Sequence, residues 1–107
     1  MMNTDSDFNI KEQSYMTREV VIRNQHGLHA RPAALFVKTA NRFAAEIWVE
    51  KEGERINGKS IMGLMMLAAA KGSRLRLTAI GEDASSLLDA LDALEELVES
   101  GFGEAYS

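Results

Sequence analysis

The sequence predicts an α+β fold, an open-faced β-sandwich of order βαββαβα in which three helices cover one face of a four-stranded, mainly antiparallel sheet. Three observations carry this prediction. Short segments that are β-branched or alternate between apolar and polar residues recur along the chain, segments with helical spacing of apolar residues lie between them, and glycine or polar turns separate the two kinds. Strands that are apolar on one face need a covering layer, which the helices can supply.

The first half of the chain contains a strand, a turn and a helix. The segment Arg18–Arg23 is short and β-branched, which favours a strand, and residues 24–27 form a turn. From Ala30 to Arg42 the apolar residues recur at helical spacing, and Pro32 stands in the first turn, where a helix tolerates it. A helix therefore begins directly after His29.

Two strands and a second helix follow. The segment Ala45–Lys51 alternates between apolar and polar residues, which predicts a half-buried strand, and Arg55–Asn57 is a short strand after the turn at residues 52–54. The pattern over Ile61–Lys71 predicts a helix that is closed by Gly72 as its left-handed cap.

A strand and a helix complete the order. Leu75, Leu77 and Ala79 alternate with polar residues, which predicts a last strand with one polar face. Asp83 can cap the final helix, which ends at Gly101. The wide apolar stripe of this helix consists of Leu87, Leu88, Leu91, Leu94, Leu97 and Val98.

Length and composition fit one domain. The chain has 107 residues, of which 46% are hydrophobic and 26% charged, a balance that is typical of a folded globular protein. Residues 1–16 are polar and precede the first predicted strand. We therefore predict a flexible N-terminal extension over residues 1–16, a folded domain over residues 17–104 and a C-terminal tail over residues 105–107.

Composition and charge exclude several classes of protein. No run approaches the roughly 18 apolar residues of a membrane span, and the N-terminus is acidic where a signal peptide is apolar, so we expect a cytoplasmic protein without membrane insertion. With no cysteine there is no disulfide or sulfur-ligated metal, and we expect no metal and no cofactor. The net charge of −4, with only a mildly basic middle part, argues against nucleic-acid binding.

The segment Gly27-Leu28-His29-Ala30-Arg31-Pro32-Ala33 places a histidine at the start of a helix. Unpaired amides at a helix start, here near Ala30 and Arg31, carry partial positive charge, which favours a neutral, nucleophilic imidazole and also attracts a phosphoryl group. Arg31 offers a planar donor fork that suits phosphate oxygens. An isolated His-x-Arg would be only a helix start and a solvated charge, and His26 with His29 lacks the third ligand of a metal site. The complete run is far more specific.

The run GLHARPA resembles the active-site signature of the HPr family of phosphocarrier proteins, and GKSIMGLMMLAAAKGS resembles the second signature of that family. The resemblance covers about residues 17 to 104. It implies a phosphocarrier, more than a true enzyme, of a phosphoenolpyruvate-dependent phosphotransferase system. His29 would accept a phosphoryl group on Nδ1 from phosphorylated enzyme I and pass it to an enzyme IIA-type acceptor, with Arg31 stabilising the phosphate. The labile phosphorus–nitrogen bond is what makes such a protein a carrier.

Ser60 stands where its hydroxyl can cap the second predicted helix. In some members of the HPr family the serine at this point is phosphorylated by an ATP-dependent kinase, so the resemblance adds a serine kinase or phosphorylase as a partner. The alternative function is a regulatory binding module that Ser60 phosphorylation controls. The ending over residues 97–104 resembles the nitrogen-related branch of the family, whereas KSIMG resembles the kinase-linked types, so the branch stays open.

The helix after Ser60 has more apolar residues than one buried face can use. A surface rich in methionine adapts to several partners, as docking on a donor and an acceptor requires. The resemblance assigns Ile61, Met62 and Met65 to the docking face, and the alternative is an unusually well-filled core. We expect the carrier to act as a monomer.

Overall fold

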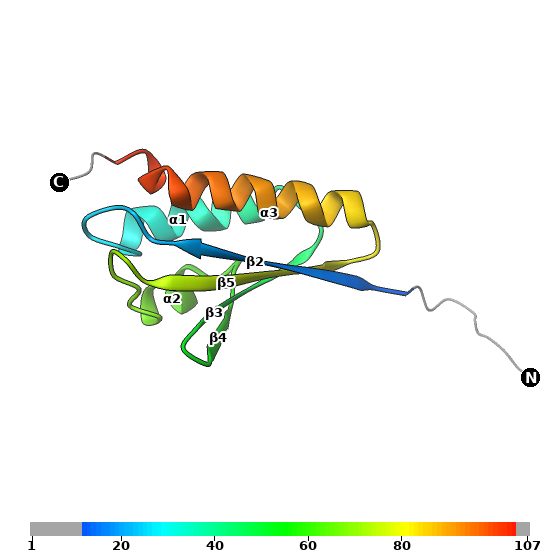
Figure 1. Cartoon of the computed structure of the whole chain (residues 1–107), viewed down its shortest axis with the longest axis horizontal. Coiled ribbons are helices and arrows are strands. Elements are labelled where there is room, and N and C mark those ends of the chain that lie inside the picture. Colours follow the sequence, from blue (N-terminus) through cyan, green and yellow to red (C-terminus); the bar gives the residue numbers. More distant parts are fainter. Residues whose placement is uncertain (1–11, 105–107) are drawn as a thin grey trace, which may run out of the picture.

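The computed structural model describes residues 12–104 and shows a four-stranded sheet in the order β2-β5-β3-β4, in which every strand pair is antiparallel (Figure 1). The helices pack on one face of this sheet, so the predicted open-faced α+β fold and its element order are confirmed. Along the chain the elements are β2 (Ser14–Val21), α1 (Ala30–Ala40), β3 (Glu46–Lys51), β4 (Glu54–Asn57), α2 (Ile61–Met66), β5 (Arg74–Gly81) and α3 (Ala84–Glu99), and a 3₁₀ turn (Gly101–Gly103) follows.

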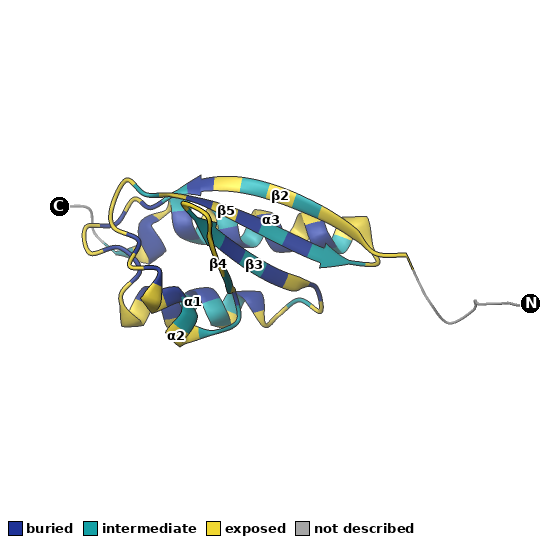
Figure 2. Ribbon diagram, turned by 90° about the horizontal axis from the view of Figure 1, so that it is seen from below, coloured by how far each residue is buried: buried dark blue, intermediate teal, exposed yellow. Residues whose placement is uncertain are grey.

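The core lies between the helices and the inner face of the sheet (Figure 2). On β5 every second residue is buried, which is the alternation that predicted a strand with one polar face. The buried residues of the strands are Val20, Ile47, Val49, Leu75, Leu77 and Ala79. The helix α3 contributes Leu87, Ala90, Leu91, Leu94 and Val98, and each fully buried leucine stabilises the fold by roughly 1.5–3 kcal/mol. Leu88, which the predicted stripe included, is 41% exposed.

The helix α2 is shorter than predicted: it ends at Met66, and the chain then turns instead of continuing to Lys71. Ala68 adopts a φ of +51°, a left-handed conformation that no residue inside a right-handed helix can have. The next residue, Ala69, is buried, and its carbonyl accepts the amide hydrogen of Leu28 at 2.9 Å. The helical pattern in the sequence could not reveal this end because a tertiary contact causes it.

Gly72 is left-handed, as predicted, but it caps no helix. Its φ is +89°, and its amide donates a hydrogen bond to the carbonyl of Ile22 at 2.8 Å. This residue therefore closes the connection between the end of β2 and the start of β5.

The strand β2 begins at Ser14, earlier than the predicted start at Arg18. The register pairs Ser14 with Gly81 and Met16 with Ala79 of β5, so residues 14–16 of the predicted extension belong to the sheet. These three residues include no β-branched one and the start of β2 is mostly exposed to solvent, so the local sequence pattern did not indicate a strand here. The rest of the predicted extension, residues 1–11, and the predicted tail, residues 105–107, lie outside the described residues.

Glu99, the last residue of α3, connects this helix to β2. One carboxylate oxygen accepts the amide hydrogen of Val21 at 2.9 Å, and the other accepts the Nε hydrogen of Arg23 at 2.8 Å. The hydrogen bond from the Val21 amide, helped by the Arg23 guanidinium and opposed by burial, lowers the pKa of the Glu99 carboxyl. The charged carboxylate is therefore favoured by folding.

We expect Glu99→Gln to destabilise the protein at neutral pH by about 0.5–1.5 kcal/mol, the usual value of a hydrogen bond. Because the folded-state pKa is lowered, the contribution of Glu99 is fully present above its unfolded pKa, near 4.5, and is lost as the pH falls through the folded value. The difference between variant and wild type should therefore shrink in acid. Urea unfolding from pH 7 to pH 3 checks this, with exposed Glu96→Gln as the control. A pH-independent difference would contradict the expectation.

Candidate functional site

His29 is the N-cap residue of α1, and its ring is partly exposed. Its backbone is extended, its carbonyl accepts the amide hydrogen of Ala33 at 3.0 Å, and its side chain makes no capping hydrogen bond. The side chain is 42% exposed. The backbone of His29 thus starts the helix, as predicted, while the imidazole stays accessible to a reactant.

The turn before His29 depends on Gly27. This residue has a φ of +66°, and a Cβ at its position would lie 2.2 Å from the carbonyl oxygen of Ala69. Next to it, buried Leu28 donates its amide hydrogen to the same oxygen. The loop is therefore held tightly against the segment after α2, which determines where the ring of His29 emerges.

A carboxylate from the end of the described chain reaches the ring of His29. One oxygen of Glu104, Oε2, lies 3.2 Å from Nε2 of His29. The other oxygen, Oε1, accepts a hydrogen bond of 3.0 Å from Nδ2 of Asn24, which also donates to the carbonyl of Gly27 at 2.9 Å. An ionised carboxylate can only accept hydrogen bonds, so its position beside Nε2 favours the imidazole tautomer that has the hydrogen on Nε2 and the lone pair on Nδ1.

Neither Asn24 nor Glu104 is among the residues that the sequence pattern singled out. They lie 80 residues apart in the sequence, so no local motif contains both. The sequence signal that could have pointed to Glu104 is the Gly-Phe-Gly run directly before it. In the structure this run is a 3₁₀ turn (Gly101–Gly103), in which buried Phe102 adopts a φ of +58° and bends the chain after α3. That turn directs the chain back to the start of α1.

The other residues predicted around His29 lie on the same surface. Ala30 and Arg31 are the first residues of α1 and are exposed. The ring of His26 stands edge-on to that of His29, with 6.0 Å between the centroids. Both histidines border a shallow depression of about 240 Å³ that residues 68–70 also line. Over residues 12–104, no group of three or more histidine or acidic side chains is placed to hold a metal ion.

Ser60 caps α2 as predicted. Its backbone is extended, and Oγ accepts the amide hydrogen of Gly63 at 3.0 Å. The side chain is half-buried, directly before the exposed Ile61. The serine therefore satisfies a helix-start amide that would otherwise have no partner in the helix.

Ser60→Ala should cost about 1 kcal/mol in the free energy of unfolding, because the Gly63 amide loses its partner. Ser60→Asp keeps an acceptor and adds a negative charge that the helix start favours, so it should be close to wild type. Urea denaturation of the three proteins checks this expectation. If both variants lost the same free energy of unfolding, the hydrogen-bond acceptor at residue 60 would not be the cause of the loss.

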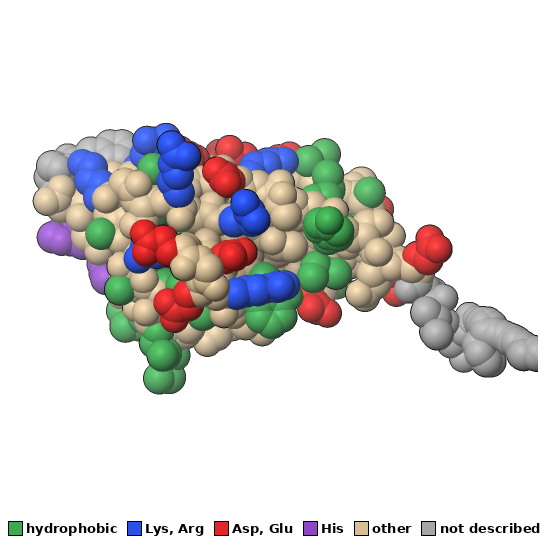
Figure 3. Space-filling view, turned by 60° about the horizontal axis from the view of Figure 1, so that its bottom comes forward, with side chains coloured by type: hydrophobic (Ala, Val, Ile, Leu, Met, Phe, Trp, Pro, Cys, Tyr) green, Lys and Arg blue, Asp and Glu red, His purple; other side chains and the backbone are tan. Residues whose placement is uncertain are grey.

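Four apolar side chains of α2 face solvent, and we call them the α2 patch. They are Ile61, Met62, Met65 and Met66, with exposed fractions of 42%, 73%, 44% and 70%. Leu64 alone in this short helix is fully buried. Met66 therefore joins the three residues that the resemblance assigned to docking. Hydrophobic side chains gather at the end of the molecule where the histidines lie (Figure 3).

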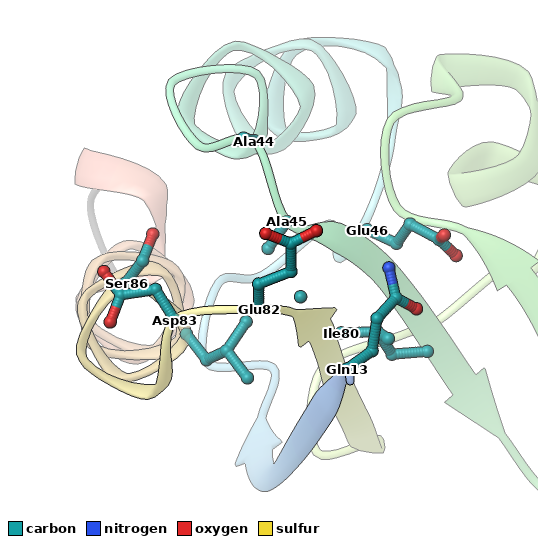
Figure 4. Close-up of a pocket in the computed structure, with 10 residues that line it drawn as sticks. Gln13, Ala44, Ala45, Glu46, Ile80, Glu82, Asp83 and Ser86 are labelled. Carbon is teal, nitrogen blue, oxygen red and sulfur yellow. The ribbon is translucent and has the colours of Figure 1, made fainter. Parts of the chain in front are cut away.

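A second pocket, of about 390 Å³, is lined by residues from the start of β3 and from the end of β5 to the first turn of α3 (Figure 4). The β2–β5 register places its residues Gln13 and Gly81 at the end of these strands that is far from His29. One of its carboxylates, Asp83, accepts the amide hydrogen of Ser85 at 3.2 Å and caps α3. This pocket is separate from the histidine site.

Comparisons with known proteins agree with this geometry. Residues 16–100 match the family model described as "PTS HPr component phosphorylation site". The chain is 47% identical over 89 residues to phosphocarrier protein HPr of Neisseria meningitidis, covering 83% of this chain and 97% of that protein. It is 50% identical over 76 residues to the HPr-like protein Crh of Bacillus subtilis, covering 71% and 89%.

The structure is also similar to a solved one. The crystal structure of HPr-C-His from Thermoanaerobacter tengcongensis matches with a TM-score of 0.77 and 48% identity, over 84% of this chain and 98% of that one. In the described part of the chain, no helix has the length and apolar character that crossing a membrane requires.

Proposed function

This chain belongs to the HPr family of the phosphotransferase system, and from that premise we propose that it accepts a phosphoryl group on His29 from phosphorylated enzyme I and transfers it to an enzyme IIA-type protein. The observation that carries the proposal is the partly exposed imidazole at the start of α1, whose Nε2 lies 3.2 Å from a carboxylate oxygen of Glu104. We also propose that the carrier acts in the cytoplasm and as a monomer.

The transfer is a displacement at phosphorus. The lone pair of Nδ1 forms the new bond, and the bond from phosphorus to the donor breaks with its electron pair remaining on the donor. Nε2 keeps its hydrogen, so the ring gains positive charge while the oxygens of the phosphoryl group stay negative. The unpaired amides at the start of α1 attract those oxygens, and Arg31 supplies further donors.

The test is to incubate the protein with enzyme I from the same organism and labelled phosphoenolpyruvate, and then to expose the product to acid and to alkali. Label that is lost in acid and survives alkali is expected, because a phosphorus–nitrogen bond is acid-labile. Absence of label, or label that survives acid, would contradict the proposal.

Docking of the donor and acceptor proteins is assigned to Ile61, Met62 and Met65 of the α2 patch. Exposed apolar side chains that are contiguous mark interaction sites, and flexible methionines can adapt to more than one partner. The patch and the histidines lie at the same end of the molecule (Figure 3), so a partner seated on α2 is close to His29.

Met62→Lys should raise the KM for phosphorylation by enzyme I about 10-fold and leave kcat almost unchanged, because it removes binding and not chemistry. The control is Leu88→Lys, which introduces the same charge at an exposed leucine of α3. Initial-rate measurements over a range of carrier concentrations distinguish the two variants. Equal effects would place docking elsewhere.

A second candidate function is regulation through Ser60. This serine caps α2 beside Ile61 and Met62, and a phosphate there would suit the helix start while placing two negative charges next to an apolar surface. Docking would be blocked without unfolding. A cognate kinase and phosphorylase would be the partners, and acid-stable label on Ser60 from ATP is the result that favours this function.

A further inference from the structure

We propose that Asn24 is a positioning residue for phosphoryl transfer, which acts through Glu104 by holding its carboxylate against Nε2 of His29. This inference rests on the proposed function and assigns its site a residue that does not touch the reacting atoms. The three side chains form one continuous chain of contacts, 3.0 Å from Asn24 to Glu104 and 3.2 Å from Glu104 to His29.

The orientation of the Asn24 amide follows from its partners. Its nitrogen faces the carbonyl of Gly27 and the carboxylate of Glu104, both of which can only accept hydrogen bonds. Both hydrogens of the NH₂ group are therefore used, and the oxygen cannot replace the nitrogen. Asn24 can act on Glu104 in one way only, as a donor.

The burial of Asn24 argues against a purely structural role. The residue is fully buried, and its Oδ1 accepts no hydrogen bond from the described residues. A buried polar atom without a partner costs free energy, and this cost offsets part of what the two hydrogen bonds of the NH₂ group contribute to stability. The cost is explained if the NH₂ group is needed for its hold on Glu104.

Glu104 has two effects on the transfer step. By accepting from Nε2–H it keeps the lone pair on Nδ1, where the phosphorus–nitrogen bond forms. As Nδ1 attacks, the ring becomes positive, and a carboxylate that is already in place stabilises that charge without having to reorganise. Glu104 is only 16% exposed, so water screens this interaction less than at an open surface.

The experiment is a mutant cycle that combines Asn24→Ala with Glu104→Gln. In the wild-type background, Asn24→Ala should lower kcat/KM for phosphorylation about 3- to 10-fold, which corresponds to the lower part of the range of coupling energies within one hydrogen-bond network. A glutamine at position 104 has a single carbonyl, which can accept from Asn24 or from His29 but not from both. With Glu104→Gln present, removing Asn24 should therefore cause no further loss, because the carbonyl becomes free for His29.

A second readout is the tautomer of His29, measured by ¹⁵N NMR. The wild-type ring should carry its hydrogen on Nε2, and Asn24→Ala should shift it toward the mixture of tautomers of an unconstrained imidazole. The matched control is Asn57→Ala, which removes an asparagine that accepts the Lys59 amide hydrogen in another turn. If Asn24→Ala does not fold, Glu104→Ala should produce the same shift of tautomer.

The outcomes are distinct. Equal losses from Asn24→Ala in both backgrounds would mean that Asn24 acts through Gly27 and the loop, which overturns the positioning role. An unchanged His29 tautomer in Asn24→Ala, or in Glu104→Ala, would overturn it as well. If the wild type takes up no label from enzyme I, the proposed function fails, and the tautomer still decides whether Asn24 positions His29.

Discussion

His29→Ala is expected to take up no phosphoryl group from enzyme I. The variant removes both ring nitrogens, and the neighbouring donors, the amides of α1 and the guanidinium of Arg31, cannot form a covalent bond to phosphorus. The side chain of His29 makes no capping hydrogen bond, so the variant should fold with almost unchanged stability. Labelling from phosphoenolpyruvate measures the loss, and urea unfolding verifies the fold.

The matched control is His26→Ala. His26 is an imidazole in the same loop, 6.0 Å from His29 between ring centroids and also exposed. It should still be labelled, because only His29 lies at the start of α1 with its Nε2 against a carboxylate. Retention of label in His29→Ala together with loss of label in His26→Ala would show that His26 is the phosphorylated residue.

Among substitutions that add a single methyl group to the site, Gly27→Ala is expected to destabilise the protein most. The new Cβ would lie 2.2 Å from the carbonyl oxygen of Ala69, a distance at which atoms overlap, so the backbone must move. Movement breaks the hydrogen bond from Leu28 to that oxygen. Left-handed strain alone costs an alanine about 1–2 kcal/mol, and with the overlap we expect a loss of about 3 kcal/mol or more.

Gly53→Ala separates the two causes. Gly53 has a φ of +85°, but a Cβ at its position meets nothing within 4 Å. This variant should lose only the cost of left-handed strain, about 1–2 kcal/mol. Denaturant midpoints of both variants check the difference, and labelling should be slowed in Gly27→Ala because its loop positions His29. Equal midpoints would show that the contact with Ala69 relaxes freely.

Features that depend on neighbouring residues could be predicted from the sequence. The start of α1 after His29, the caps at Ser60 and Asp83, and the alternation on β5 all follow from local backbone rules, and the structure confirms each of them. The element order could be predicted for the same reason. What these features share is that their physical cause lies within a few residues.

Features with a distant cause could not be predicted. The helix α2 ends early because the chain must bring Ala69 to the loop at Leu28. The strand β2 extends to Ser14 because β5 offers a partner there, although residues 14–16 include no β-branched residue that would indicate a strand. The contacts of Asn24 and Glu104 need the whole domain to be folded before these two side chains meet.

The strand order has a consequence for folding during synthesis. The first described strand, β2, pairs only with β5, so Ser14 must wait for Gly81. At about 5–20 residues per second, ribosomes need several seconds to make the intervening chain. During that time the backbone of β2 has no partner strand. Its charged residues Arg18 and Glu19 disfavour pairing with other nascent chains. Such long-range pairing also makes folding slow relative to a helical bundle of this size.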